Sequence, residues 1–127
     1  MPARTGQQYI NGLREQEREV WLGGERVKDV TRHKGLSGGV RAIAGLYDMQ
    51  HDAKLREVMT YASPSSGQPV GRSFDNPTTK EALEARTRMM LNWARATCGM
   101  MGRSPDFMNV TFAAWGAAAD YFGEKRP

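Results

Sequence analysis

Apolar residues recur with helical spacing in three parts of the chain, residues 35–52, 78–102 and 104–122. A spacing of three or four residues places them on one side of a helix, where they can pack against a core. The sequence therefore predicts three helices, with apolar stripes that run through Leu36, Val40, Ile43 and Tyr47, then Leu83, Met90, Trp93, Thr97 and Met101, then Met108, Phe112, Trp115, Ala119 and Phe122.

Polar residues mark two helix starts. Thr5 with Gln8, and Thr78 with Glu81, have the spacing of a capping box, in which side chain and backbone bond reciprocally at a helix N-terminus. The first pair predicts a further helix over residues 5–16.

The ends of the long helices are also indicated. Ser37 is expected to cap the helix that follows it, and Gly102 is expected to end the next one. Ser104 is a good cap for the last helix, with Pro105 at its first helical position. Arg103 is therefore expected at a sharp corner between two helices.

Two short segments favour β-structure. Gly23 and Gly24 separate two β-prone runs, which predicts a hairpin with a two-residue turn. Residues 55–61 either extend the preceding helix or begin a strand. Residues 62–77 are rich in Ser, Gly and Pro, which predicts a loop or an irregular hairpin.

The last predicted helix is apolar on nearly every side, because a second stripe joins the first. Such a helix is expected to be buried all round, yet the shorter upstream elements could cover only one of its faces. We therefore expect residues 1–127 to be the N-terminal helical domain of a larger protein, and an oligomer is the alternative. The second stripe comprises Phe107, Val110, Ala114, Ala117 and Tyr121.

Composition narrows the class of protein. A chain of 127 residues suits one domain. Its net charge of +4 comes from cations scattered among acids, which does not favour a nucleic-acid-binding face. No apolar run suits a membrane span or a signal peptide, and the single cysteine, Cys98, suits a reducing compartment. We expect a cytoplasmic protein in which Cys98 is inert core.

Candidate chemistry centres on Arg103. The free N–H groups of a helix N-terminus favour an anion, and an adjacent guanidinium adds donors in a planar fork. This pair would suit a phenolate, carboxylate or phosphate. The alternative is that Arg103 binds the carbonyls that end the preceding helix. His33 and His51 have no convincing set of partner ligands, so no metal site is predicted.

Several motifs stand in order along the chain, namely "RTGQQYINGL", "VWLGGERVKDVTRH", "LYDMQHD", "LREVMTY" and, most specifically, "WARATCGMMGRSPDFMNV". Together they resemble the N-terminal region of the 4-hydroxyphenylacetate 3-monooxygenase (oxygenase component) family. The resemblance implies a mainly α N-terminal domain of an acyl-CoA dehydrogenase-like fold, with one or two small β-hairpins.

The resemblance also implies an activity. Such proteins are two-component monooxygenases that use reduced FAD, delivered by a separate flavin reductase, to hydroxylate a phenol ortho to its hydroxyl, usually as homo-tetramers. The main flavin contacts would lie outside residues 1–127, so this chain alone is expected to be inactive. The alternatives are a non-catalytic interaction or oligomerisation module, and a flavin-dependent acyl-CoA dehydratase of the same superfamily.

The resemblance assigns substrate-binding positions to Arg103, Ser104 and Phe107. Arg103 would contact the phenol oxygen. Phe107 stands where the family has a tyrosine, so it lacks the hydroxyl that helps hold the substrate. A second departure is "SFDNP", residues 73–77, where the family has an apolar "SFLIP"-like segment.

Overall fold

The computed structural model describes residues 2–100 and 105–123, with the side chains of residues 105–107 left aside. Contacts divide the chain into two compact units. We call residues 3–56 the N-terminal unit and residues 57–123 the C-terminal unit, and each is described by itself.

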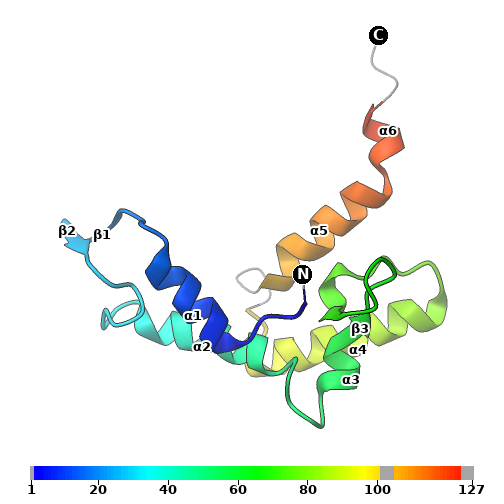
Figure 1. Ribbon diagram of the computed structural model, residues 1–127, viewed down its shortest axis with the longest axis horizontal. Coiled ribbons are helices and arrows are strands. Elements are labelled where there is room, and N and C mark those ends of the chain that lie inside the picture. The colour runs from blue at the N-terminus through cyan, green and yellow to red at the C-terminus, as the bar shows by residue number, and fades with distance from the viewer. Residues whose placement is uncertain (1, 101–104, 124–127) are drawn as a thin grey trace. The chain divides into compact units, whose positions relative to one another are not determined.

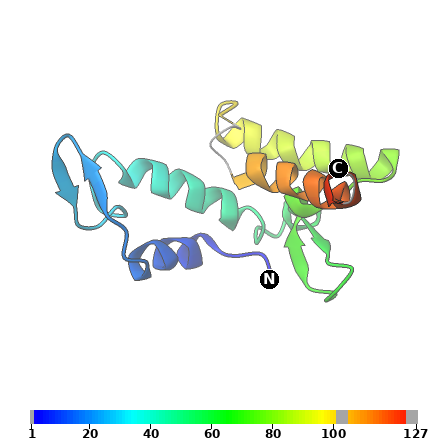
Figure 2. The same cartoon turned by 90° about the horizontal axis from the view of Figure 1, so that it is seen from above.

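The N-terminal unit pairs two helices. Helix α1 (Gly6–Glu15) and helix α2 (Ser37–Asp48) lie side by side (Figures 1 and 2). The predicted capping box begins α1: the Gln8 N–H donates to the Thr5 hydroxyl at 3.1 Å, and the Thr5 N–H donates to the Gln8 side chain at 2.8 Å. Ser37, by contrast, does not cap α2. It is the first helical residue and is buried, and its neighbour Leu36 takes the cap position without a side-chain bond.

The first turn of α1 meets the last turn of α2 at Gly6. The Gly6 N–H donates to the Asp48 carboxylate at 2.7 Å. A Cβ at position 6 would lie 2.5 Å from the carbonyl oxygen of Ala44, much closer than an ordinary contact. A residue without a side chain is therefore what allows the two helices to approach here.

The predicted glycine hairpin is confirmed. Strands β1 (Val20–Leu22) and β2 (Glu25–Val27) pair in antiparallel fashion, with Leu22 opposite Glu25 (Figure 2). Gly23 and Gly24 have φ values of +60° and +84°. A two-residue turn with both φ values positive matches the right-handed twist of the strands, and glycine adopts it without a steric cost.

The C-terminal unit begins with short elements. Residues 55–61 do not extend the preceding helix, because α2 ends at Asp48 and a separate short helix, α3 (Arg56–Met59), follows. The alternative, the start of a strand, is confirmed by strand β3 (Thr60–Ala62), which follows α3 directly. Strand β4 (Pro69–Gly71) pairs with β3 in antiparallel fashion, so the polar segment contributes to an irregular hairpin, which spans residues 60–71. A single 3₁₀ turn, η1 (Arg72–Phe74), follows β4.

Helix α4 (Lys80–Ala96) supplies the core of this unit. Met89 is fully buried and Trp93 is 3% exposed, whereas Leu83 of the predicted stripe is exposed. The start of the helix is shifted by one residue from the prediction, because Thr79 rather than Thr78 caps it, by accepting from the Ala82 N–H at 3.2 Å.

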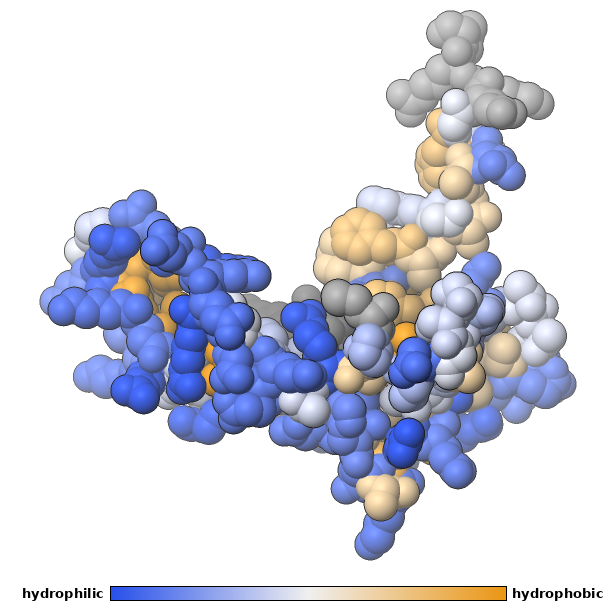
Figure 3. All heavy atoms as spheres, viewed as in Figure 1, coloured by the Kyte–Doolittle hydropathy of each residue, from blue (hydrophilic) through white to orange (hydrophobic). Residues whose placement is uncertain are grey.

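The last predicted helix is interrupted. Helix α5 (Pro105–Ala117) begins at the expected proline, and a turn at Ala118 separates it from helix α6 (Ala119–Gly123). From Met108 to Gly123 its large apolar side chains are exposed, so the expected burial is not present within the described residues; they are Met108, Phe112, Trp115, Tyr121 and Phe122. Figure 3 shows hydrophobic surface over α5 and α6.

Candidate functional site

The predicted substrate corner lies largely outside the described residues. Arg103 and Ser104 are not among them, and only the backbone of Phe107 is, within α5. The flanks of the corner are clear: α4 ends at Ala96 with Thr97 as its C-cap, and α5 begins at Pro105. The predicted end of α4 near Gly102 is therefore wrong, and residues 97–104 connect the two helices.

The chain turns sharply just after α4. Cys98 and Gly99 have φ values of +51° and +82°, which no α-helix contains. The predicted apolar stripe of this helix therefore ends before Met101, because Thr97 is already the C-cap. The Thr97 hydroxyl donates to the Trp93 carbonyl at 2.8 Å. Cys98 is exposed, so the expectation that it is inert core is wrong.

The 3₁₀ turn η1 connects the elements around the corner. It contacts both α4 and α5. Ser73 in η1 is 1% exposed, and its hydroxyl accepts from the Asn109 side-chain amide of α5 at 3.0 Å. On the α4 side, the Arg86 guanidinium donates to the Asp75 carbonyl at 3.2 Å.

Arg72 fixes η1 to the end of α3. Its guanidinium donates to the carbonyls of Val58 at 3.0 Å, Thr60 at 2.7 Å and Glu57 at 3.2 Å. It also lies 3.7 Å from the Asp75 carboxylate, with both side chains less than one-fifth exposed. Asp75, the acid in the segment "SFDNP" that departs from the family pattern, is thus paired with Arg72.

Tyr61 lies beneath the same guanidinium, with the Arg72 Cζ atom 5.9 Å from the centre of its ring. Burial raises the pKa of the Tyr61 phenol, the nearby Asp75 raises it further, and Arg72 opposes both effects. The phenol therefore stays protonated at neutral pH. The sequence did not predict that these residues form a cluster. Ser73 and Asp75 belong to the departing segment "SFDNP", and Asn109 belongs to the motif that contains Arg103.

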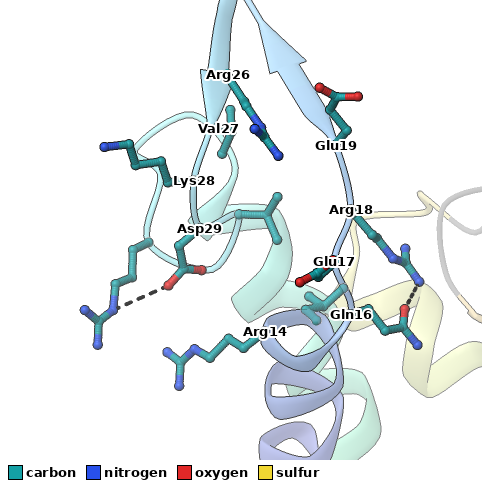
Figure 4. A pocket seen from close by; sticks show the side chains of 12 residues that line it. Arg14, Gln16, Glu17, Arg18, Glu19, Arg26, Val27, Lys28 and Asp29 are labelled. Carbon is teal, nitrogen blue, oxygen red and sulfur yellow. Dashed lines mark hydrogen bonds and ion pairs between the residues drawn. The ribbon is translucent and has the colours of Figure 1, made fainter.

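A separate, charged cleft lies in the N-terminal unit, between the end of α1 and the stem of the β1–β2 hairpin (Figure 4). Its volume is about 830 Å³. Five cations and three acids line it, with Leu13, Val27 and Val30 between them. The charged residues are Arg14, Arg18, Arg26, Lys28, Arg32, Glu17, Glu19 and Asp29.

Three of the five cations already have a partner at the cleft, which for Arg14 and Arg18 is a neutral oxygen and for Arg32 is an acid. Arg14 donates to the Thr31 hydroxyl at 3.1 Å, Arg18 is turned toward Gln16, and Arg32 lies 3.6 Å from Asp29 (Figure 4). Hydrogen bonds from Thr31 lower the pKa of the Asp29 carboxyl, against a smaller opposing effect of desolvation. Such a mixed cleft is not suited to a single compact anion.

In residues 2–100 and 105–123, no three His, Cys, Asp or Glu side chains come together as metal ligands. His33 accepts from the Gly35 N–H through Nδ1 at 3.1 Å. The cleft has no aromatic wall for an isoalloxazine ring, so its lining does not fit FAD. Within the described part of the chain, no helix has the length and apolarity to span a membrane.

Comparison with known proteins gives a consistent result. The family model described as "4-hydroxyphenylacetate 3-hydroxylase N terminal" matches residues 5–127. The 4-hydroxyphenylacetate 3-monooxygenase oxygenase component of Geobacillus sp. (strain PA-9) is 46% identical over 127 residues, which are all of this chain and 25% of that protein. The corresponding protein of Thermus thermophilus is 48% identical over 122 residues, 96% of this chain and 25% of that protein.

Solved structures agree with this. An oxygenase component of 4-hydroxyphenylacetate 3-monooxygenase, complexed with FAD and 4-hydroxyphenylacetate, matches with a TM-score of 0.88 and 48% identity over 96% of this chain and 25% of that chain. An archaeal 4-hydroxybutyryl-CoA dehydratase from N. maritimus matches less closely, with a TM-score of 0.62 and 26% identity over 72% of this chain and 18% of that chain. The chain thus spans about a quarter of the length of the curated relatives that it matches.

Proposed function

Because the chain belongs to the 4-hydroxyphenylacetate 3-hydroxylase N-terminal family, we propose that it is the substrate-positioning part of a two-component aromatic hydroxylase. The proposed reaction adds oxygen ortho to the hydroxyl of a phenol and uses reduced FAD from a separate reductase. Identity of 46–48% to oxygenase components across nearly the whole chain carries the proposal.

We propose that the main flavin contacts come from other parts of a complete oxygenase, because the lining of the N-terminal cleft does not fit FAD. Those parts would follow the acyl-CoA dehydrogenase-like plan, in a cytoplasmic homo-tetramer. The flavin carries the oxygen chemistry, and this chain positions and polarises the substrate.

Arg103 is the proposed substrate anchor. Its guanidinium stays charged at all working pH values and donates hydrogen bonds in a fixed plane. Directed at a phenol oxygen, it stabilises the negative charge that develops there, which makes the ortho carbon more electron-rich. We propose Ser104 as the cap of α5 beside it, and the N–H groups at a helix start add to the positive field.

Phe107 is the proposed specificity difference. A phenylalanine offers the substrate an apolar ring face but no hydroxyl. A site that contains Phe107 should prefer a phenol with no polar group next to this side chain. A tyrosine at the same position would favour a phenol that can form a hydrogen bond with its hydroxyl. We therefore propose that the preferred phenol differs from the 4-hydroxyphenylacetate named for the relatives.

A chimera tests the proposal. Residues 1–127 replace the matching N-terminal quarter of the Thermus thermophilus oxygenase component, which is 48% identical. The chimera is assayed for hydroxylated product over a panel of phenols with a flavin reductase, NADH and FAD. Arg103→Ala should lower kcat/KM by about 10²–10³-fold, as the loss of one oxyanion donor does.

Matched variants sharpen the result. Arg95→Ala removes an exposed arginine of α4 and should leave turnover unchanged. Phe107→Tyr should lower KM for 4-hydroxyphenylacetate. A soluble, FAD-binding chimera that yields no product from any phenol would refute the proposed function, and full activity of Arg103→Ala would remove Arg103 from the site.

The exposed apolar side chains of α5 and α6 favour a second candidate, an interaction or oligomerisation module. Sedimentation of the 127-residue chain tests it. Stable self-association that Trp115→Asp abolishes would support the module, and a monomer at all concentrations would exclude oligomerisation.

A further inference from the structure

The helices on either side of the substrate corner are connected to each other through one short turn. Arg86 of α4 donates to the Asp75 carbonyl, and Asn109 of α5 donates to the Ser73 hydroxyl. Residues 72–75 therefore bond to both helices, and we refer to this segment as the 72–75 brace. Arg103 lies between the two helices in the sequence.

The brace is itself held firmly. Arg72 bonds to three carbonyls at the end of α3 and the start of β3, and it pairs with Asp75. Its donors thus connect the brace to α3 and the β3–β4 hairpin. A segment tied at so many points has little freedom, so a side chain bonded to it is fixed in place as well.

The Ser73–Asn109 bond is the step from this brace to the substrate motif. Ser73 is 1% exposed, so its hydroxyl would lack a water partner if Asn109 were absent. A buried polar group that loses its partner is costly, so the arrangement that keeps this bond is favoured. Asn109 lies about one helical turn after Pro105, near the start of α5.

We propose that Ser73 and Asn109 are positioning residues for Arg103: their buried hydrogen bond sets the rotation of α5 and thereby the place of the substrate anchor. The inference rests on the proposed function and extends it to two residues that are 36 positions apart in the sequence. Neither residue needs to touch the substrate.

The chimera provides the kinetic test. Ser73→Ala and Asn109→Ala should each lower kcat/KM for the phenol by about tenfold to a hundredfold, as misplacement by about 1 Å can, and should raise the yield of hydrogen peroxide relative to product. Asn109→Asp keeps the shape and can accept from the Ser73 hydroxyl, so it should restore most of the activity. Asn92→Ala is the matched control, because within the described part of the chain Asn92 donates to the Arg88 carbonyl of its own helix and not to the brace.

A double-mutant cycle separates positioning from general stability. In an Arg103→Ala background, Asn109→Ala should change kcat/KM by less than about twofold, because the residue through which it acts is gone. Additive losses would overturn the proposal. So would unchanged kinetics for Asn109→Ala alongside a large loss for Arg103→Ala, a result that leaves the proposed function intact.

Amide exchange of the 127-residue chain tests the same bond without catalysis. Asn109→Ala should speed exchange in the first turns of α5, and it should not affect α1 and α2. Equal exchange rates with and without the bond would overturn the proposal. An inactive chimera would overturn the proposed function and this inference together, whereas normal activity with unchanged exchange would overturn only the inference.

Discussion

Gly6 offers a sharp test of how the N-terminal unit is held together. In Gly6→Ala, the new Cβ would lie 2.5 Å from both the Ala44 carbonyl oxygen and an oxygen of the Asp48 carboxylate. The Asp48 side chain can rotate away, but the Ala44 carbonyl belongs to the backbone of α2 and cannot. Helix α1 must therefore move away from α2.

The size of the effect follows from that movement. Helix α1 must move by about 1 Å before the new Cβ and the Ala44 carbonyl oxygen are more than 3.4 Å apart, which is an ordinary contact. The bond from the Gly6 N–H to Asp48, now 2.7 Å, would then be too long to count as one. Overpacking costs about 1–3 kcal/mol, and a hydrogen bond to a charged group contributes about 1.5–3 kcal/mol. Allowing for the better helix propensity of alanine, we expect a loss of about 2–4 kcal/mol in the free energy of unfolding.

Gly12→Ala is the matched control, in the same helix. A Cβ at position 12 meets no atom within 4 Å. Alanine there should stabilise the unit by about 0.5–1 kcal/mol, because glycine loses more backbone entropy when a helix forms. The two identical substitutions, six residues apart, are thus predicted to have opposite signs.

The assay is urea unfolding of the 127-residue chain followed by circular dichroism. Amide exchange of α1 and α2, read by mass spectrometry, assigns the transition to this unit. The reasoning would be refuted if Gly6→Ala and Gly12→Ala changed the free energy of unfolding with the same sign. A Gly6→Ala chain as stable as the parent would refute it too. Either result would mean that the close approach of α1 to α2 does not determine stability.

Three further predictions concern single side chains. Arg72→Ala should destabilise the C-terminal unit by about 2–4 kcal/mol, because three carbonyls lose a charged donor, and thermal unfolding measures this. The hydrogen bond from Thr31 lowers the pKa of the Asp29 carboxyl, so this bond stabilises the fold fully above the ordinary pKa of 3.8. The stabilisation is lost as pH falls through the lowered pKa of the folded state. Asp29→Asn should therefore remove this part of the acid sensitivity when stability is measured against pH. Cys98 should react with a thiol reagent in the native chain as fast as in urea, and slow reaction would show that it is covered.

Local signals made much of the fold predictable. The Thr5–Gln8 box and the Gly23–Gly24 turn depend on residues close in sequence, whose conformational preferences act without help from the rest of the chain. The end of α4 was harder to predict. Apolar spacing continues past Thr97, but the backbone already leaves the helix at Cys98, where φ becomes positive.

In the candidate site, too, features set by neighbouring residues could be predicted from the sequence, and features set by long-range packing could not. Arg103, Ser104 and Phe107 were identified by a local motif, and they stay a prediction, since they lie outside the described residues or side chains. Ser73 and Asn109 could not be paired from the sequence, because their contact depends on how a hairpin, a 3₁₀ turn and two helices pack. Nothing in the spacing of Ser73 distinguishes it from the other serines of its polar segment.

The exposed apolar surface of α5 and α6 has a practical consequence for handling the chain. Between Met108 and Gly123, Asp120 is the single ionisable acid or base apart from a tyrosine, so salt has little charge to screen there. Sulfate and warming both strengthen apolar association, whereas cooling weakens it. Solubility should therefore be greatest in cold, sulfate-free buffer, and ammonium sulfate should precipitate this chain early, even though its net charge is +4.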